Sequence, residues 1–218
     1  MYTLRLYQDV FEPNTKAVPD LEAQHGIAYV YRGSATVNGQ GLSSDSAFIS
    51  RDVMSVVAGP DGASLWRWEL VRTSEPNDLA TGGGINSRLI MSRRIRMFEL
   101  VPTSKWLFRL DSIIDNEGST GLHSHPGSGI RCMIEGHLRV ESDKGECSDN
   151  WKPGDAWYEE GSYPLISTSD SGEKATFLRG MILPPEYAKY PDTAIWIEGT
   201  KTCKSDWKSY VQSVVTLL

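Results

Sequence analysis

Short apolar segments alternate along the chain with clusters of glycine, proline, aspartate and serine. This even spacing predicts the strands of jelly-roll barrels, and no segment keeps the 3.6-residue period of a long helix. The Asn38–Gly39 pair predicts a hairpin, because both residues accept the positive φ angles of a type I′ turn. The tail Trp207–Leu218 is rich in β-branched side chains and is expected to form a further strand. The pattern therefore predicts an all-β protein.

An internal repeat divides this pattern in two. The segment Gly26–Gly33 (GIAYVYRG) lines up with Gly129–Gly136 (GIRCMIEG), 103 positions later, and a second short strand follows each of them. The repeat predicts two barrels, one over residues 1–85 and one over residues 86–218, the second including the C-terminal strand. The glycine-rich stretch Asn77–Asn86 is the expected linker between them.

Candidate chemistry is concentrated at His123 and His125, two of the four histidines of the chain. Residues i and i+2 of a strand share one face, so both imidazoles can converge on a single point. Imidazole is the commonest metal-ligating side chain. An isolated His-x-His pair is more often a surface feature. Here turn residues follow the pair at Pro126–Gly127, and a Pro-Gly-Asp sequence comes one hairpin later at residues 153–155.

Together these residues resemble the two sequence motifs of the cupin family. Gly118, His123, His125 and Gly136 match the glycine, the His-x-His pair and the closing glycine of the first motif, and residues 153–155 match the second. The resemblance covers roughly residues 95 to 185. It implies a bicupin, a protein of two jelly-roll (cupin) β-barrels.

The two halves differ in their histidines. The N-terminal half has His25 alone and no His-x-His pair, so the resemblance implies a degenerate first barrel that serves as scaffold, lid or dimer surface. The second barrel also departs from the family pattern. The family's glutamate ligand would stand at Gly129 and its last histidine near Pro164–Leu165, and none of these residues can ligate through its side chain.

Glu159 is the candidate replacement for a missing ligand, followed by its neighbour Glu160. The resemblance therefore implies a metal site of His123, His125 and Glu159, with Glu159 as a ligand or a general base. The alternative is that Glu159 and Glu160 are solvated turn residues. If no third ligand exists, metal affinity should be weak, and the histidines would act as acid–base groups.

Arg131 is a further candidate catalytic residue, because by alternation it shares a strand face with Gly129. An inward arginine would need an anionic partner, either Glu159 or a substrate carboxylate. An outward position after a bulge is the alternative. Aromatic side chains of the same half are expected to line the barrel interior and contact substrate: Trp157, Tyr163, Trp106 and Phe108.

Composition and charge narrow the class of protein. The chain has 218 residues, a net charge of −6 and no basic stripe, so nucleic acid is not an expected partner. No apolar run reaches about 18 residues and no apolar leader follows Met1, so neither a membrane span nor a secretory signal is expected. The cysteines, Cys132, Cys147 and Cys203, are odd in number and not closely spaced, which favours a reducing cytoplasm over a disulfide framework.

The first functional hypothesis is a metal-dependent cupin enzyme that acts on a small organic metabolite, such as an aromatic compound or a carboxylate. One divalent ion (Fe, Zn, Mn or Ni) in the C-terminal barrel would support isomerase, lyase, decarboxylase or hydrolase chemistry. A non-haem iron dioxygenase is an alternative, which the missing glutamate and histidine disfavour. A hypothesis of a different class is a non-catalytic small-molecule-binding cupin. By resemblance, we also expect a homodimer.

Overall fold

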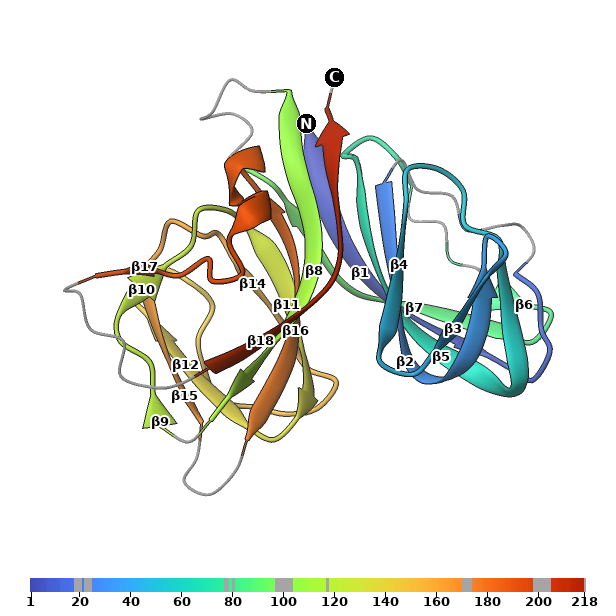
Figure 1. Cartoon of the computed structure of the whole chain (residues 1–218), viewed down its shortest axis with the longest axis horizontal. Coiled ribbons are helices and arrows are strands. Elements are labelled where there is room, and N and C mark those ends of the chain that lie inside the picture. The colour runs from blue at the N-terminus through green and yellow to red at the C-terminus, as the bar shows by residue number, and fades with distance from the viewer. Residues whose placement is uncertain are drawn as a thin grey trace. The chain divides into compact units, whose positions relative to one another are not determined.

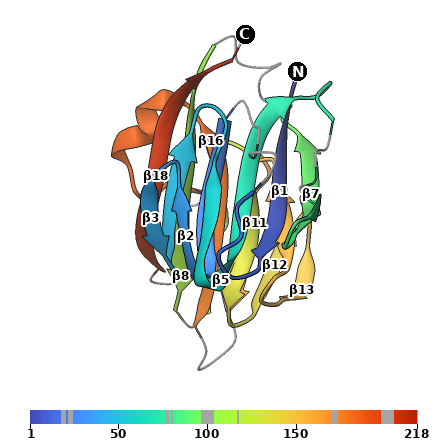
Figure 2. The same cartoon turned by 90° about the vertical axis from the view of Figure 1, so that its right-hand side faces the viewer.

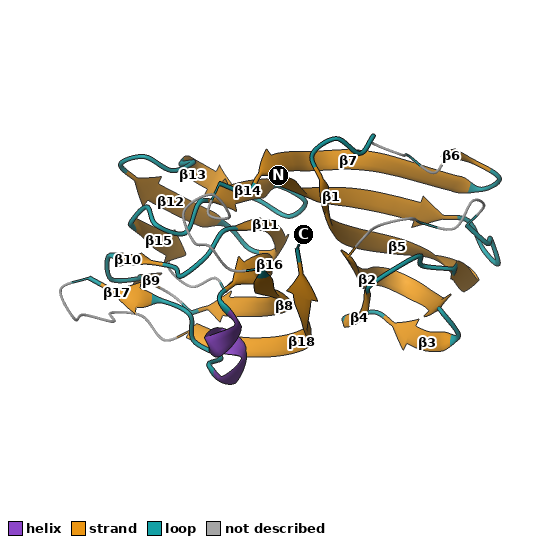
Figure 3. Cartoon of the chain, turned by 90° about the horizontal axis from the view of Figure 1, so that it is seen from above, coloured by secondary structure: helices purple, strands orange, loops and turns teal. Residues whose placement is uncertain are grey.

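The computed structural model describes residues 1–17, 21, 25–76, 79, 81–96, 104–116, 118–169, 174–197 and 205–217. Strands dominate this part of the chain, and its one helix is the short 3-10 helix η1 (Pro185–Lys189) (Figure 3). No described helix is long and apolar enough to cross a membrane. The chain divides into two compact β-rich units, Met1–Ile95 and Arg96–Leu218 (Figure 1). The predicted all-β, two-barrel fold is confirmed.

The N-terminal unit is built on one seven-stranded antiparallel sheet in the order β3-β2-β5-β1-β7-β6, with β4 paired to β2 (Figure 2). Its strands are β1 (Tyr2–Phe11), β2 (His25–Val37), β3 (Gln40–Ser43), β4 (Ser46–Ser50), β5 (Val56–Arg72), β6 (Thr81–Gly82) and β7 (Ile85–Arg94). The expected Asn38–Gly39 turn joins β2 to β3, and both residues have positive φ.

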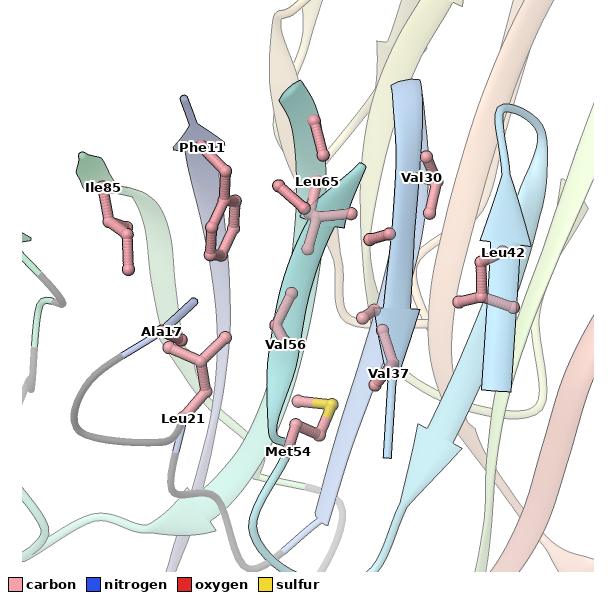
Figure 4. Close-up of a cluster of buried hydrophobic side chains, with 14 residues drawn as sticks. Phe11, Ala17, Leu21, Val30, Val37, Leu42, Met54, Val56, Leu65 and Ile85 are labelled. Atoms are coloured by element: carbon pink, nitrogen blue, oxygen red, sulfur yellow. The ribbon is translucent and has the colours of Figure 1, made fainter. Parts of the chain in front are cut away.

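A cluster of 14 buried apolar side chains fills one part of this unit (Figure 4). Its members come from β1, β2, β3, β5 and β7, from the segment between β1 and β2, and from the segment before β5. Removing this much aliphatic surface from water is the main stabilising contribution to such a barrel. The labelled members are Phe11, Ala17, Leu21, Val30, Val37, Leu42, Met54, Val56, Leu65 and Ile85.

The boundary between the units lies later than the sequence indicated. Strand β7 runs antiparallel along β1, from Phe11↔Ile85 to Thr3↔Arg94, and so belongs to the N-terminal sheet. The compact unit therefore ends at Ile95 and not at residue 85. The glycines of the expected linker form a tight turn instead, because Gly82, Gly83 and Gly84 have positive φ and join β6 to β7.

The C-terminal unit has two antiparallel sheets. The first has the order β14-β11-β16-β8-β18, and the second has the order β13-β12-β15-β10-β17, with β9 paired to β15. Strand β18 pairs along β8, so the expected C-terminal strand exists and extends the first sheet. The strands are β8 (Lys105–Asp115), β9 (Gly118–Ser119), β10 (His123–Ser124), β11 (Gly129–Glu135), β12 (Leu138–Ser142), β13 (Ser148–Trp151), β14 (Ala156–Glu159), β15 (Leu165–Ser169), β16 (Ala175–Leu183), β17 (Ile195–Trp196) and β18 (Ser205–Thr216).

The sequence repeat corresponds to a repeated strand arrangement. The order β4-β2-β5-β1 in the first unit matches β14-β11-β16-β8 in the second. The glycines that end the repeated segment, Gly33 and Gly136, have φ of +76° and +73°. A Cβ atom on Gly33 would collide with the carbonyl of Gly62, and one on Gly136 would collide with the carbonyl of Lys174. At each of these two positions glycine is required for two reasons: the φ angle is positive, and a second backbone approaches too closely for a Cβ atom.

Gly136→Ala should lower the free energy of unfolding by about 3 kcal/mol, since it combines a left-handed backbone with a steric collision. Gly154→Ala is the matched control, because Gly154 has φ of +91° but no atom within 4 Å of the position that a Cβ would take. The control should lose only about 1 kcal/mol. Urea denaturation of both variants measures the difference, and equal losses would contradict the collision.

Candidate functional site

A narrow cavity lies between the two sheets of the C-terminal barrel. Its volume is about 30 Å³, which is enough for roughly two water molecules. The apolar lining includes Ile113, Leu138, Val140, Trp157, Leu165 and Phe177. The titratable lining is Asp115, His123, His125, Arg131, Glu159, Arg179 and Asp192. Most of the predicted site residues are therefore gathered in one buried place.

His123 and His125 both line this cavity and are almost fully buried. Nδ1 of His123 donates to the carbonyl of Gly121 at 2.9 Å, and Nδ1 of His125 donates to the carbonyl of Thr193 at 3.2 Å. These hydrogen bonds leave Nε2 of each ring as the nitrogen with a lone pair. The ring centroids are 5.1 Å apart. The two rings therefore lie next to each other in the cavity, although only His123 belongs to strand β10.

Glu159 is the carboxylate next to the histidines. Its Oε1 accepts a hydrogen bond from Nε1 of Trp157 at 2.9 Å. Its Oε2 lies 2.6 Å from Nη2 of Arg131 and 3.4 Å from Nε2 of His125. The contact with Arg131 lies outside hydrogen-bond geometry, so it is ionic in character. The alternative interpretation of Glu159 as a solvated turn residue does not fit a side chain that is 10% exposed.

Arg131 points into the barrel, on the same face as Gly129. Its side chain is fully buried, and Nη1 donates to the carbonyl of Gly129 at 2.7 Å. A Cβ atom on Gly129 would lie 2.9 Å from that same Nη1. The guanidinium therefore fills the space beside Gly129, where the cupin pattern expects a glutamate. Glu159 is the direct cross-strand partner of Gly129, so a carboxylate is supplied from the neighbouring strand instead.

Arg131 also belongs to a row of charged residues across the sheet. Arg131 is paired with Arg179, and Arg179 is paired with Asp111 on the next strand. Asp111 accepts two hydrogen bonds from Arg179, from Nε at 2.8 Å and from Nη2 at 3.0 Å, and its Oδ2 lies 2.8 Å from Nε of Arg109. Nη1 of Arg179 donates to Oγ1 of Thr193 at 3.2 Å. Since the carbonyl of Thr193 holds His125, the buried ion pair also supports the site.

Burial and neighbouring charge shift the protonation of several groups. Burial holds the pKa of His125 well below its usual value, and the positive charge of Arg131 lowers it further. His125 is therefore a neutral imidazole with a free lone pair. Burial raises the pKa of Asp115 above its usual value, although Ser205 Oγ donates to this carboxyl at 2.6 Å. Asp115 lines the cavity but lies in no motif, so sequence reasoning missed it.

The predicted aromatic contacts divide into two groups. Trp157 lines the cavity and stacks on Trp151, with ring centroids 5.6 Å apart. It orients Glu159 through the hydrogen bond from its Nε1. Trp106 and Phe108 are fully buried, but they do not line the cavity. They occupy even-numbered positions of β8, whereas the cavity-lining Ile113 and Asp115 occupy odd-numbered positions, so the two pairs lie on opposite faces of the strand. Tyr163 is half-buried in the bend before β15 and does not line the cavity. Contact of Tyr163, Trp106 or Phe108 with a substrate in this cavity has no support in this geometry.

The donor types at the site fit a divalent metal ion. Two imidazoles whose Nδ1 atoms are anchored on carbonyls resemble the usual arrangement of histidine ligands, in which the second ring nitrogen is held by a carbonyl or carboxylate. Glu159 supplies the chemically suitable third donor. In the described part of the chain, however, no three His, Cys, Asp or Glu side chains are grouped as a ready metal cluster. His123 and His125 fit the ion as they stand, whereas Glu159 is held by Arg131.

The N-terminal barrel has charged residues in its interior but no corresponding pair of histidines among the residues described. Arg67 makes a bidentate pair with Asp9, through Nε at 2.6 Å and Nη2 at 3.1 Å. Its guanidinium also lies 4.3 Å from the ring centroid of Tyr7. His25 is buried apart from them, and neither ring nitrogen has a hydrogen-bond partner within the described ranges. Burial, together with the charge of Arg51, lowers the pKa of His25.

Asp111→Asn should lower the free energy of unfolding by about 3–5 kcal/mol, because it leaves buried guanidinium groups without their carboxylate. The control is Glu141→Gln, which removes an exposed ion pair with Arg139 at 3.3 Å. The control should change stability by less than about 1 kcal/mol. Chemical denaturation distinguishes them, and a loss for Asp111→Asn as small as that of the control would show that the buried pair is not stabilising.

His25 should make the fold acid-sensitive. Its folded-state pKa is lowered, so the unfolded chain binds the proton more strongly. The stabilisation is complete above the unfolded value of about 6.5 and is lost as pH falls through the folded pKa. His25→Phe should therefore flatten the decline in unfolding free energy between about pH 6.5 and 5. Denaturation curves across this range test it, and an unchanged slope would refute the assignment.

Comparison with known proteins establishes the fold. No protein-family model and no curated protein matches the sequence. Salicylate 1,2-dioxygenase from Pseudoaminobacter salicylatoxidans is 13% identical, with a TM-score of 0.53 over 85% of this chain and 70% of that chain. Oxalate decarboxylase from Lactobacillus farciminis, solved as a formate complex, is also 13% identical, with a TM-score of 0.56 over 88% of this chain and 79% of that chain.

The oxalate decarboxylase of Bacillus subtilis is a third similar structure, 14% identical with a TM-score of 0.54 over 83% of this chain and 68% of that chain. Another structure of that enzyme concerns its Mn(II) centres. At such low identity the likeness shows the fold, which agrees with the strand order and with the His-x-His motif. The chain therefore shares the two-barrel fold of these enzymes.

Proposed function

We propose that this protein is a metal-dependent cupin enzyme whose active site is the C-terminal cavity and whose substrate is a small organic carboxylate. One observation carries the proposal: the neutral His125 and its neighbour His123 present Nε2 in a buried cavity that also holds Glu159 and Arg131. Titratable groups gathered in a buried cavity are characteristic of active sites.

His123 and His125 would hold one divalent ion, with Glu159 as the third protein ligand. Such an ion supplies Lewis-acid chemistry, polarising a substrate carbonyl or activating water. A set of two histidines and one carboxylate suits Fe, Zn, Mn and Ni alike. The similar structures include an enzyme with Mn(II) centres, which supports a divalent metal without fixing its identity.

The chain's own residues suggest how a substrate would be held. Arg131 has a buried Nε with no hydrogen-bond partner among the described residues, so it keeps donor capacity for an anionic group. Glu159 and Asp115 are the carboxyl groups that could accept or donate a proton in the cavity. Lyase, decarboxylase, isomerase and hydrolase reactions all suit this arrangement.

Two alternative functions rest on specific observations. A dioxygenase is favoured by the likeness to salicylate 1,2-dioxygenase. A non-catalytic binding protein is favoured because no three His, Cys, Asp or Glu side chains of the described residues are grouped so that they could hold a metal ion. The homodimer and the cytoplasmic location expected from the sequence stay predictions.

Metal content tests the proposal. Protein purified from medium with added Mn, Fe, Zn and Ni should hold a divalent metal, and His123→Ala or His125→Ala should abolish it. Ser124→Ala, on the same short strand between the histidines, should leave it unchanged. Glu159→Gln should keep the fold with a lower free energy of unfolding, because the buried Arg131 loses its carboxylate. It should also lose most turnover, whether this carboxylate ligates or moves a proton. Elemental analysis measures the metal, and its absence from the wild-type protein even after reconstitution would favour a non-catalytic binding protein or a metal-free histidine catalyst.

A further inference from the structure

The positive charge that neutralises Glu159 in this structure comes from Arg131. Nη2 of Arg131 lies 2.6 Å from Oε2 of Glu159, and the same oxygen lies 3.4 Å from Nε2 of His125. This is the oxygen that would face an ion bound by the histidines. The guanidinium of Arg131 is therefore already paired with the carboxylate oxygen of Glu159 that a metal ion would need.

The guanidinium has little freedom to move out of the way. Arg131 is fully buried, its Nη1 is fixed on the carbonyl of Gly129, and Gly129 has no side chain to displace it. The next residue across the sheet is a second buried guanidinium, that of Arg179. Both charges lie away from water, so solvent screens their repulsion of a divalent cation only weakly.

Arg179 is less suited to this role than Arg131, because its guanidinium is already bound by a carboxylate, that of Asp111, which Arg109 also contacts. Two of its nitrogens are bound to the carboxylate of Asp111, and its third nitrogen donates to Thr193. Arg131 has no such bidentate partner within the described part of the chain. Its only ion-pair contact there is Glu159.

We propose that Arg131 is a built-in competitor for the metal ion, and that its ion pair with Glu159 sets the metal affinity of the site. The inference rests on the metal site of the proposed function and extends it, because it assigns the control of metal affinity to one arginine. Binding through all three ligands requires Glu159 to exchange Arg131 for the ion. The metal affinity of the site is accordingly lower than its three ligands would give without Arg131.

The test is calorimetric titration of metal-free full-length protein with MnCl2. Arg131→Gln should bind Mn(II) about tenfold more tightly than the wild type, equivalent to about 1.4 kcal/mol. Arg131→Lys keeps the charge and should stay close to the wild type. In the Arg131→Gln background, adding Glu159→Gln should abolish the gain, which a double-mutant cycle measures as coupling between the two residues.

The outcomes separate this inference from the proposed function. If Arg131→Gln binds no more tightly than the wild type, or if its gain survives Glu159→Gln, the inference is overturned even when the wild type binds metal. If Arg131→Gln binds and the wild type does not, the inference stands and the metal-dependent function fails. Binding by neither protein overturns both.

A folding control is needed because Arg131→Gln leaves Glu159 without its cation. Should the variant be unfolded without metal, its refolding with MnCl2 is compared with refolding in MgCl2 at the same ionic strength. Recovery in Mn(II) alone is expected, since a ligand that binds only the folded state stabilises it. Failure to refold with either salt, together with no gain in Mn(II)-induced melting-temperature shift for Arg131→Met, would overturn the inference.

Discussion

Compensation of buried positive charge inside the C-terminal barrel is the constraint on which its site depends. The guanidinium groups of Arg109, Arg131 and Arg179 are buried there, and an unpaired buried charge would destabilise the fold by several kcal/mol. Asp111 lies in contact with both Arg109 and Arg179, and Glu159 compensates Arg131. The position of Glu159 therefore follows from the arginine beside it as much as from any ligand. The same arrangement holds Thr193, and through it the ring of His125.

The N-terminal barrel obeys the same constraint without a site. Its buried Arg67 is bidentate on Asp9, across the strand pair β1–β5 that corresponds to β8–β16. Each half of the repeat thus keeps one arginine–aspartate pair between equivalent strands. Convergent histidines are found in the second half alone among the described residues. The repeated pair is consequently a feature of barrel construction, whereas the paired histidines distinguish the second barrel.

Sequence could predict whatever depended on local alternation. Strand parity placed His123 and His125 on one face, and the repeat indicated two barrels with the same strand order. It could not choose the direction of Arg131, since one bulge would have reversed it. The prediction that Trp106 and Phe108 contact substrate failed because both faces of β8 are buried. Apolar side chains therefore did not reveal which face of the strand lines the cavity. Asp115 carried no motif, and its role in the lining depends on pairing between strands distant in sequence.

The last strand has a consequence for how the protein is made. Strand β18 supplies Ser205 and Trp207 to the cavity wall, and Ser205 donates to Asp115, which lies on β8. In the part of the chain that the structure describes, the strands of the N-terminal unit pair with one another within residues 2–94, so this unit can fold while synthesis continues. The cavity is closed only after residues 205–207 have left the ribosome. During translation, the barrel that carries the candidate site is therefore completed after the N-terminal unit.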